Sequence, residues 1–378
     1  MTANVALHSE HRRRRNSECP EEGDVEDLSL WLGLKKDWYL HERRIGTHMS
    51  GRQVENMQKT IRPGRKLWLA AGLLPLLGLT ACGGSTSSSG ATSSTVSVSS
   101  MRIGLSINGA AIEFYQTLRQ AAQQEANSLG VKLLVDAPTT TQGQNTGIAT
   151  LLAEKVNALC LAPLDEHAIV PSVQAANTDK VPVITVDESS AGGNIYTYIA
   201  SPNTQGGVIA GQYIEKLMPN GGVLGVIPGT LGDTTGLARL SGLMSVLDAD
   251  PDIQVIQSEP GNWVTDTGYD VASTLLTAHP NLTAIFAEND EMGVGALQAV
   301  QQIYKRSIPI VGYNGDTVAL TAIKAGTMTA TVGQNPTLMG QDCVQQAIRA
   351  IEGKPSPGPT ISVPITMVDS SNVNSYSP

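Results

Sequence analysis

The chain of 378 residues lacks the motifs on which most enzymes and metal sites depend. Its 4 cysteines show neither the spacing of a zinc site nor that of a disulfide framework. It has no His pair at metal-ligand spacing, no Gly-x-Ser-x-Gly elbow and no Gly-x-x-x-x-Gly-Lys phosphate loop. We therefore expect no catalytic residue, no metal and no cofactor.

An excess of positive charge is also missing. The formal net charge is -9, which weighs against polyanionic partners, so nucleic acid is not an expected ligand. The one basic run, Arg12 to Arg15, has no helix-turn-helix pattern beside it and is followed by acidic residues. We interpret residues 1–56 as a disordered or mis-assigned leader and Met57 as the true start of translation.

No apolar run is long enough to span a bilayer as a mature helix. The longest candidate, Leu67 to Leu79, follows basic residues and ends at Leu79-Thr80-Ala81-Cys82. This anatomy resembles that of bacterial lipoproteins, which implies a signal peptide at 57–81, a lipid on Cys82 and a Gly/Ser-rich tether at 82–100. The alternative is an ordinary cleaved signal that contains a cysteine. Either interpretation predicts an extracytoplasmic body, and which membrane would carry the anchor stays open.

From Met101 onward, short β-branched runs alternate with amphipathic helical stretches. The first such helix, Phe114 to Leu129, is predicted to stop at Gly130. Further helices are predicted to begin at His167, Gly206 and Leu237. The alternation predicts an α/β fold with parallel sheets covered by helices on both faces, and residues 101–378 exceed what one core usually organises. We expect two doubly wound lobes.

Polar and acidic residues follow the predicted strands. In open parallel sheets, ligands bind beyond the carboxyl ends of the strands. Taken singly, each of these residues would also suit a tight turn or a helix cap. The exits are Ser106-Ile-Asn-Gly109, Ala162-Pro-Leu-Asp165, Asp187-Glu188, Pro228-Gly-Thr230, Glu288-Asn-Asp290 and Gly312-Tyr-Asn-Gly315.

Six segments between Met101 and about Val368 resemble signatures of one family, the ribose/galactose class of periplasmic solute-binding proteins of sugar ABC transporters. They are Val181-Pro-Val-Ile-Thr-Val-Asp187, Ile199-Ala-Ser-Pro-Asn203, Gly206-Gly-Val-Ile-Ala-Gly211, Leu275-Leu-Thr-Ala-His-Pro280, Ala287-Glu-Asn-Asp-Glu-Met292 and Ala330-Thr-Val-Gly-Gln334.

The resemblance implies the type I periplasmic binding protein fold, with two lobes joined by a three-segment hinge. The lobes would comprise 101–202 plus 335–362 and 203–334 plus 363–378. It also implies a monomer that captures a pentose, hexose or sugar alcohol and delivers it to the permease subunits of an ABC importer. An alternative is a receptor module that binds a sugar-like autoinducer or chemoattractant and signals to a membrane sensor.

The resemblance assigns ligand contacts by position. Aromatic rings would stack on the sugar, and charged or amide groups would bind its hydroxyls. For Phe114 the alternative is core packing, and for Arg239 it is a solvated helix position. The stacking residues would be Phe114, Tyr115 and Trp263, and the polar ones Asp187, Arg239, Asn289 and Gln334.

Two positions depart from the pattern of ribose binders. Glu188 stands where those proteins have an arginine, and Asn314 stands where an aspartate is usual. These exchanges alter donors and acceptors, so they predict a ligand other than ribose. Glu188 could instead pair with Arg239 or face solvent.

Two cysteines belong to the predicted folded body. Cys160 lies in an apolar run, which favours a buried structural thiol over a reactive one. Whether it pairs with Cys343 stays open.

Overall fold

The computed structural model describes residues 97–110, 112–304 and 306–377. The leader at 1–56, the signal peptide at 57–81 and the lipidation site Cys82 lie outside these residues. Of the tether, only its end is described, and it contains a short 3-10 helix, η1 (Val98–Ser100). Within the described ranges, no helix has the length and apolar character that crossing a membrane requires.

Six strands form the sheet of the first lobe, in the order β11-β5-β4-β3-β1-β2. All their pairings are parallel. Strands buried on both faces are predominantly apolar, as β3 and β4 are here. The strands are β1 (Arg102–Ser106), β2 (Lys132–Asp136), β3 (Ala158–Leu161), β4 (Val183–Val186), β5 (Thr197–Ala200) and β11 (Thr360–Ser362).

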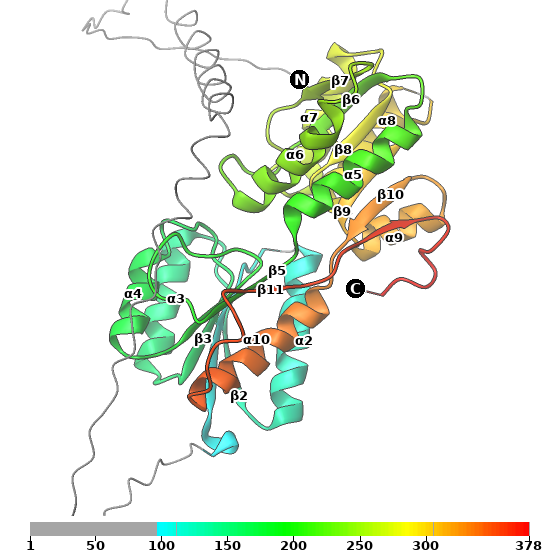
Figure 1. Cartoon of the computed structure of the whole chain (residues 1–378). Coiled ribbons are helices and arrows are strands. Elements are labelled where there is room, and N and C mark those ends of the chain that lie inside the picture. The colour runs from blue at the N-terminus through cyan, green and yellow to red at the C-terminus, as the bar shows by residue number, and fades with distance from the viewer. Residues whose placement is uncertain (1–96, 111, 305, 378) are drawn as a thin grey trace, which may run out of the picture. The chain divides into compact units, whose positions relative to one another are not determined.

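Helices cover both faces of this sheet. In Figure 1, α3 and α4 lie on one face, and α2 and α10 lie on the other. In α2, the buried residues Leu118, Ala122 and Ala126 recur at helical spacing, and the helix stops at Gly130 with φ 71° as predicted. The helices are α2 (Glu113–Leu129), α3 (Thr141–Ala153), α4 (Val170–Thr178) and α10 (Pro336–Ile351).

The second lobe repeats this plan with the strand order β12-β10-β9-β8-β6-β7. Its pairings are parallel except that β12 runs antiparallel to β10. The strands are β6 (Gly222–Ile227), β7 (Ile253–Gln257), β8 (Ala284–Ala287), β9 (Ile310–Asn314), β10 (Ala330–Gly333) and β12 (Thr366–Asp369).

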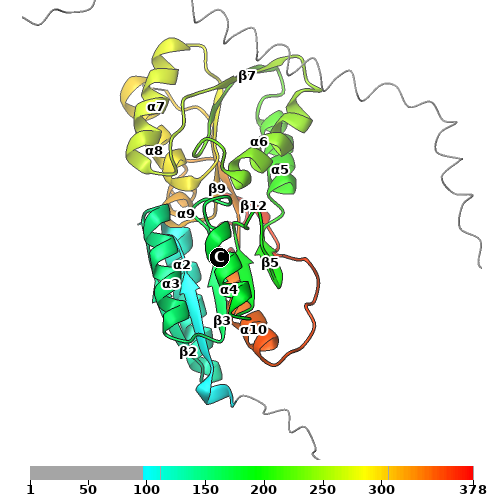
Figure 2. The same cartoon turned by 90° about the vertical axis from the view of Figure 1, so that its left-hand side faces the viewer.

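Figure 2 shows α5 and α6 on one side of the second sheet and α7 and α8 on the other. Separate apolar clusters fill the two sides, with Leu243 and Phe286 in one and Leu275 and Met292 in the other. The expectation of two doubly wound parallel-sheet lobes is therefore confirmed. The helices are α5 (Asn203–Leu217), α6 (Thr234–Leu247), α7 (Thr265–Ala278), α8 (Asp290–Ile303) and α9 (Thr317–Lys324).

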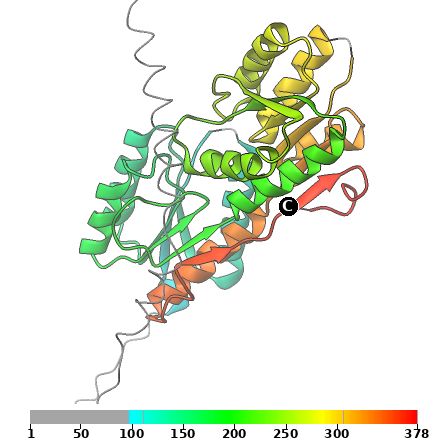
Figure 3. The same ribbon diagram turned by 45° about the horizontal axis from the view of Figure 1, so that its top comes forward.

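The chain passes between the two sheets at three places. It leaves β5 of the first sheet for α5 and β6, and it returns from β10 to α10. Finally it runs from β11 in the first sheet to β12 in the second, and Figure 3 shows this segment in orange to red. The passage from β10 to α10 contains Gln334 and Asn335.

A disulfide bond joins Cys160 of β3 to Cys343 of α10. Their Cα atoms are 6.1 Å apart, and both residues are fully buried. The open question of their pairing is thus answered. Because 183 positions separate the two residues, the bond ties a helix from the end of the chain to the sheet at its beginning.

Three helices begin three residues away from the start that the sequence predicts. The helix expected from His167 begins at Val170, because Asp165 Oδ1 caps a turn by accepting from the backbone N–H of His167 and of Ala168. The helix expected from Leu237 begins at Thr234. Asp233 accepts from the N–H groups of the first turn there, so an N-cap extends the helix beyond its apolar face. Similarly, α5 begins at Asn203 rather than Gly206.

Candidate ligand-binding site

A cavity of about 310 Å³ lies beyond the carboxyl ends of strands from both sheets. All nine side chains that the family resemblance singled out line it, and they come from both lobes. They are Phe114, Tyr115, Asp187, Glu188, Arg239, Trp263, Asn289, Asn314 and Gln334. Since parallel strands bring their exits to one edge, residues far apart in the sequence meet here.

The aromatic residues differ in how freely they reach the cavity. Phe114 is only 3% exposed and belongs to the core of the first lobe, so its ring both packs in the core and borders the cavity. It meets Tyr115 edge to face, with ring centroids 5.2 Å apart. The hydroxyl of Tyr115 donates to Asp187 Oδ2 at 2.8 Å, which fixes the position of that carboxylate.

Trp263 comes from the second lobe, in the loop between β7 and α7. Its ring packs against two apolar clusters, that of the first lobe with Phe114 and that of the second lobe with Met292. A Cβ added at Gly229 would lie only 1.9 Å from the ring, so the indole depends on a glycine across from it. The guanidinium carbon of Arg239 lies 5.6 Å from the ring centroid, within cation–π range.

Arg239 is buried, at 4% exposure, so the solvated alternative is wrong. Its Nε donates to Asn203 Oδ1 at 2.9 Å, and its Nη1 donates to the backbone oxygen of Glu288 at 2.7 Å. Its guanidinium carbon lies 3.9 Å from the ring centroid of Tyr313. These contacts hold the planar group rigidly at the cavity wall, with donors left for a ligand.

Asp187 and Glu188 follow β4 directly. Burial raises the pKa of Asp187 to about 6, although Arg239 and the Tyr115 hydroxyl oppose the shift. Burial and then the charges of Asp233 and Asp187 raise the pKa of Glu188 to about 9. Asp187 is therefore the more easily ionised of the two.

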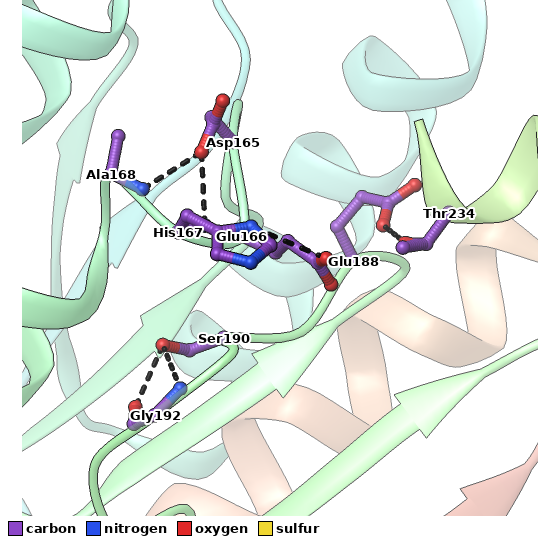
Figure 4. Close-up of polar contacts among 8 residues, drawn as sticks. All are labelled: Asp165, Glu166, His167, Ala168, Glu188, Ser190, Gly192 and Thr234. Atoms are coloured by element: carbon purple, nitrogen blue, oxygen red, sulfur yellow. Dashed lines mark hydrogen bonds and ion pairs between the residues drawn. The ribbon is translucent and has the colours of Figure 1, made fainter. Parts of the chain in front are cut away.

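The position of Glu188 matches neither of its two alternatives. The structure contains no ion pair between Glu188 and Arg239, both of which it describes, and Glu188 is only 8% exposed. Instead, the hydroxyl of Thr234 donates to Glu188 Oε2 at 2.5 Å, as Figure 4 shows. Because Thr234 begins α6, this bond joins the two lobes.

Three amide side chains form the deepest wall. Asn289 caps α8 by accepting from Met292 N, and its Nδ2 donates to the backbone oxygen of Trp263 at 3.0 Å. Gln334 Nε2 donates to Asn314 Oδ1 at 2.8 Å, and Asn314 Nδ2 donates to Asp316 Oδ2 at 2.9 Å. This chain of bonds fixes which end of each amide faces its neighbour.

Three of the six described non-glycine residues with positive φ line the cavity. Asp187, Trp263 and Asn314 have φ of 65°, 66° and 126°, which residues other than glycine seldom adopt. Such conformations persist where the surrounding structure holds them, and they cluster at ligand clamps.

Sequence reasoning missed part of the lining. The further lining residues follow β1, β2, β3 and β6, in loops and in the first turns of the next helices. The sequence marks several of these positions as strand exits but assigns their residues no role. Their signal was the position after a strand, which turn and cap residues share. They are Asn108, Ile112, Thr139, Thr140, Thr141, Pro163, Leu164, Asp165, Glu166, His167, Thr230, Leu231, Gly232, Asp233, Thr234 and Thr235.

The chain matches the model of the periplasmic binding protein domain over residues 103–355. It is 32% identical to the ribose import binding protein of Bacillus subtilis over 295 residues, which cover 78% of this chain and 95% of that protein. The chain belongs to this family of periplasmic binding proteins. Members of this family bind substrates for transport, and the family is not an enzyme family.

Solved structures of similar proteins share the fold. One from Actinobacillus succinogenes with bound D-allose has a TM-score of 0.69 and 26% identity, and the match covers 73% of this chain and all of that one. The myo-inositol binding protein of Caulobacter, bound to myo-inositol, also has a TM-score of 0.69 and 26% identity, with 73% of this chain and 96% of that one covered. The type I periplasmic binding protein fold is thus confirmed.

Proposed function

We propose that this periplasmic binding protein captures a monosaccharide or related sugar alcohol in the cavity between its lobes and delivers it to an ABC importer. The observation that carries the proposal is the convergence of all nine residues on one cavity, which aromatic rings and hydrogen-bonding groups line together. A sugar has weakly apolar faces and a polar rim, which suit this combination. The ligands of the similar proteins, ribose, D-allose and myo-inositol, are of this class.

Contacts between the lobes support a closing mechanism. Besides the bond from Thr234 to Glu188, Glu113 of α2 reaches the second lobe twice. Its backbone N–H donates to Glu291 Oε1 at 3.3 Å, and its Oε1 accepts from Thr317 N at 3.0 Å. A ligand held by residues of both lobes would favour the conformation that brings them together. The closed form would be the one that the permease subunits recognise.

The three passages of the chain between the sheets would serve as the hinge. Lobe boundaries at 202/203, 334/335 and 362/363 fall in short connections between elements. Hinges are usually a few loop or element-terminal residues that absorb backbone rotation. We further propose that the body acts outside the cytoplasm as a monomer, held to a membrane by a lipid on Cys82.

A thermal-shift screen of the purified protein tests the proposal. The panel comprises pentoses, hexoses, polyols and nucleosides. A ligand at a hundred times its Kd stabilises the native state by about 2.7 kcal/mol, a readily measured rise in melting temperature. A selective rise that is lost in Trp263→Ala would support sugar capture in this cavity. No rise with any sugar or polyol would contradict it and favour an autoinducer or another non-sugar ligand.

A further inference from the structure

Carboxylates outnumber cations along the part of the cavity formed by the loops after β3, β4 and β6. Asp165, Glu166, Glu188 and Asp233 all line it, with His167 as the neighbouring cation when protonated. Figure 4 shows Glu188 extending to Thr234, with Asp165, Glu166 and His167 drawn on its other side. Arg239 also lines the cavity, but two of its donors are already bonded within the protein.

Three of these four carboxylates have clear local partners. Asp165 and Asp233 accept from backbone N–H groups at the starts of their turns. Glu166 Oε1 lies 3.4 Å from His167 Nδ1. Each therefore has a structural role that accounts for its position.

Glu188 is different because it is buried without a cation. It accepts a hydrogen bond from the hydroxyl of Thr234, and the charges that raise its pKa, those of Asp233 and Asp187, are negative. Burial and these two carboxylates raise its pKa to about 9. A buried carboxylate in such surroundings is stabilised in its ionised form by a positive charge placed against it.

A second buried acceptor, in a residue that lines the same cavity, has no donor in the described part of the chain. Gln334 is 1% exposed, and its Oε1 has no hydrogen-bond partner in the described part of the chain. Its Nε2 donates to Asn314 Oδ1, so Oε1 is the atom of this amide that can still accept a hydrogen bond. Buried polar atoms of this kind are normally satisfied, and the cavity beside Gln334 is where a ligand donor would come from.

We propose that the captured solute is an amino sugar or amino sugar alcohol, whose protonated amine binds Glu188. This inference rests on the proposed function and narrows its ligand class. An ammonium group has three donors and no acceptor, which matches a site with spare acceptors. Its hydrogen bond to an ionised carboxylate also joins two opposite charges, an attraction that a neutral hydroxyl lacks.

A ligand amine would stabilise the contact between the two lobes at Glu188. Glu188 of the first lobe approaches Thr234 and Asp233 of the second, so closing brings two carboxylates together. In the unliganded closed form a proton on Glu188 offsets that repulsion, and a ligand ammonium between the two carboxylates would take the place of this proton. The ammonium would stabilise the closed form more than the open form, in which the carboxylates lie apart. Differential stabilisation of this kind drives closure.

Calorimetric titration of the full chain at pH 7 tests the inference with matched pairs of ligands. The pairs are glucosamine with glucose, galactosamine with galactose, and glucamine with glucitol. In at least one pair we expect the amine to bind roughly tenfold or more tightly than its neutral partner, as loss of a charge-assisted bond predicts. N-acetylation of the preferred amine removes its charge and should abolish the preference.

Glu188→Gln keeps the shape and removes the charge, so it should bring each amine to within about threefold of its neutral partner. The control is Glu259→Gln, at an exposed position that does not line the cavity, and it should keep the wild-type preference. Equal or tighter binding of the neutral member in every pair would overturn the inference, as would a preference that survives in Glu188→Gln.

Failure of the inference and failure of the proposed function give different results. If neutral sugars or polyols bind and their amines do not, the inference is wrong and the proposed capture of a sugar is still supported. No binding by any member of the pairs or of the screening panel would remove both.

Discussion

The inner and outer ends of the cavity use their polar groups in different ways. At the inner end, Arg239, Asn289, Asn314 and Gln334 are all at most 5% exposed and bonded to the protein. At the outer end, Asp165, His167 and Leu231 are exposed. The inner end is organised before any ligand arrives, whereas the outer end exposes charged side chains to solvent. Glu188, buried yet surrounded by carboxylates, lies between the two.

This difference separates affinity from selectivity. Groups held rigidly by neighbouring bonds lose little freedom when a ligand binds, so they contribute most to affinity. Glu188 discriminates among ligands by charge, because a buried charge without a matching partner penalises the wrong ligand. Changes at the inner end should therefore weaken every ligand, and changes at Glu188 should reorder ligands.

Arg239→Ala should have the largest effect. It removes the cation beside Asp187 and the donors to Asn203 and to the Glu288 backbone. We expect affinity for any ligand found in the screen to fall at least about a hundredfold, since a buried charged partner is worth roughly 3–5 kcal/mol. Calorimetry measures the affinity, and circular dichroism checks that the variant is folded.

Arg239→Lys is the matched control for that variant. It keeps the charge but loses the planar fork, so it should restore part of the stability and little of the affinity. Wild-type affinity in a folded Arg239→Ala protein would mean that the inner end does not dominate binding.

Trp263→Ala should have the next largest effect. Loss of a stacking ring and its buried area weakens binding by roughly 1–3 kcal/mol. Trp263→Phe retains an aromatic face at the same backbone position and should recover most of the loss in a calorimetric titration. If both variants bind like wild type, the ring packs beside Gly229 without touching the ligand.

The pH dependence of stability should distinguish Glu188 from the inner end. A carboxyl group whose pKa rises on folding binds more protons in the native state, so its contribution to stability falls as pH rises. The pKa of about 9 for Glu188 places this loss between pH 4.5 and about 9. Glu188→Gln should flatten part of the decline and be more stable than wild type at pH 8, by about 1 kcal/mol or more.

Thermal denaturation of the unliganded protein at pH 5 and pH 8 measures this slope. Asp187, Glu288 and Asp290, with pKa values raised to about 6, 7 and 8, contribute to the same decline, so some slope should remain. Glu259→Gln serves again as the control and should leave the decline unchanged. A wild-type slope in Glu188→Gln would show that this carboxyl group titrates normally.

The sequence predicted the ligand-binding residues of the inner end of the cavity but not those of the outer end. The exits of parallel strands lie at one edge of a sheet, so Asn289 and Asn314 of the second lobe could be expected from the sequence to lie near each other. Periodicity predicted the helices and the stop at Gly130. These features depend on local pattern and on fold class.

Contacts between lobes and between distant segments could not be predicted in this way. The bond from Thr234 to Glu188 depends on how two loops of different lobes face each other. The pairing of Cys160 with Cys343 depends on α10 returning to the first sheet after the whole second lobe. The turn at His167 depends on a cap by Asp165 that outweighs the helical pattern. No single stretch of sequence specifies such contacts.

The smallest effect is expected at the outermost position. Leu231 is 77% exposed although it borders the cavity, so its side chain contributes little buried area. Leu231→Ser should change the free energy of unfolding by no more than about 0.5 kcal/mol. Affinity for a sugar should change less than about threefold, and by similar factors for an amine and its neutral partner, because a serine adds no charge. A tenfold loss for every ligand in parallel titrations would mean that this leucine covers the bound solute, and the outer end would then contribute to affinity as the inner end does.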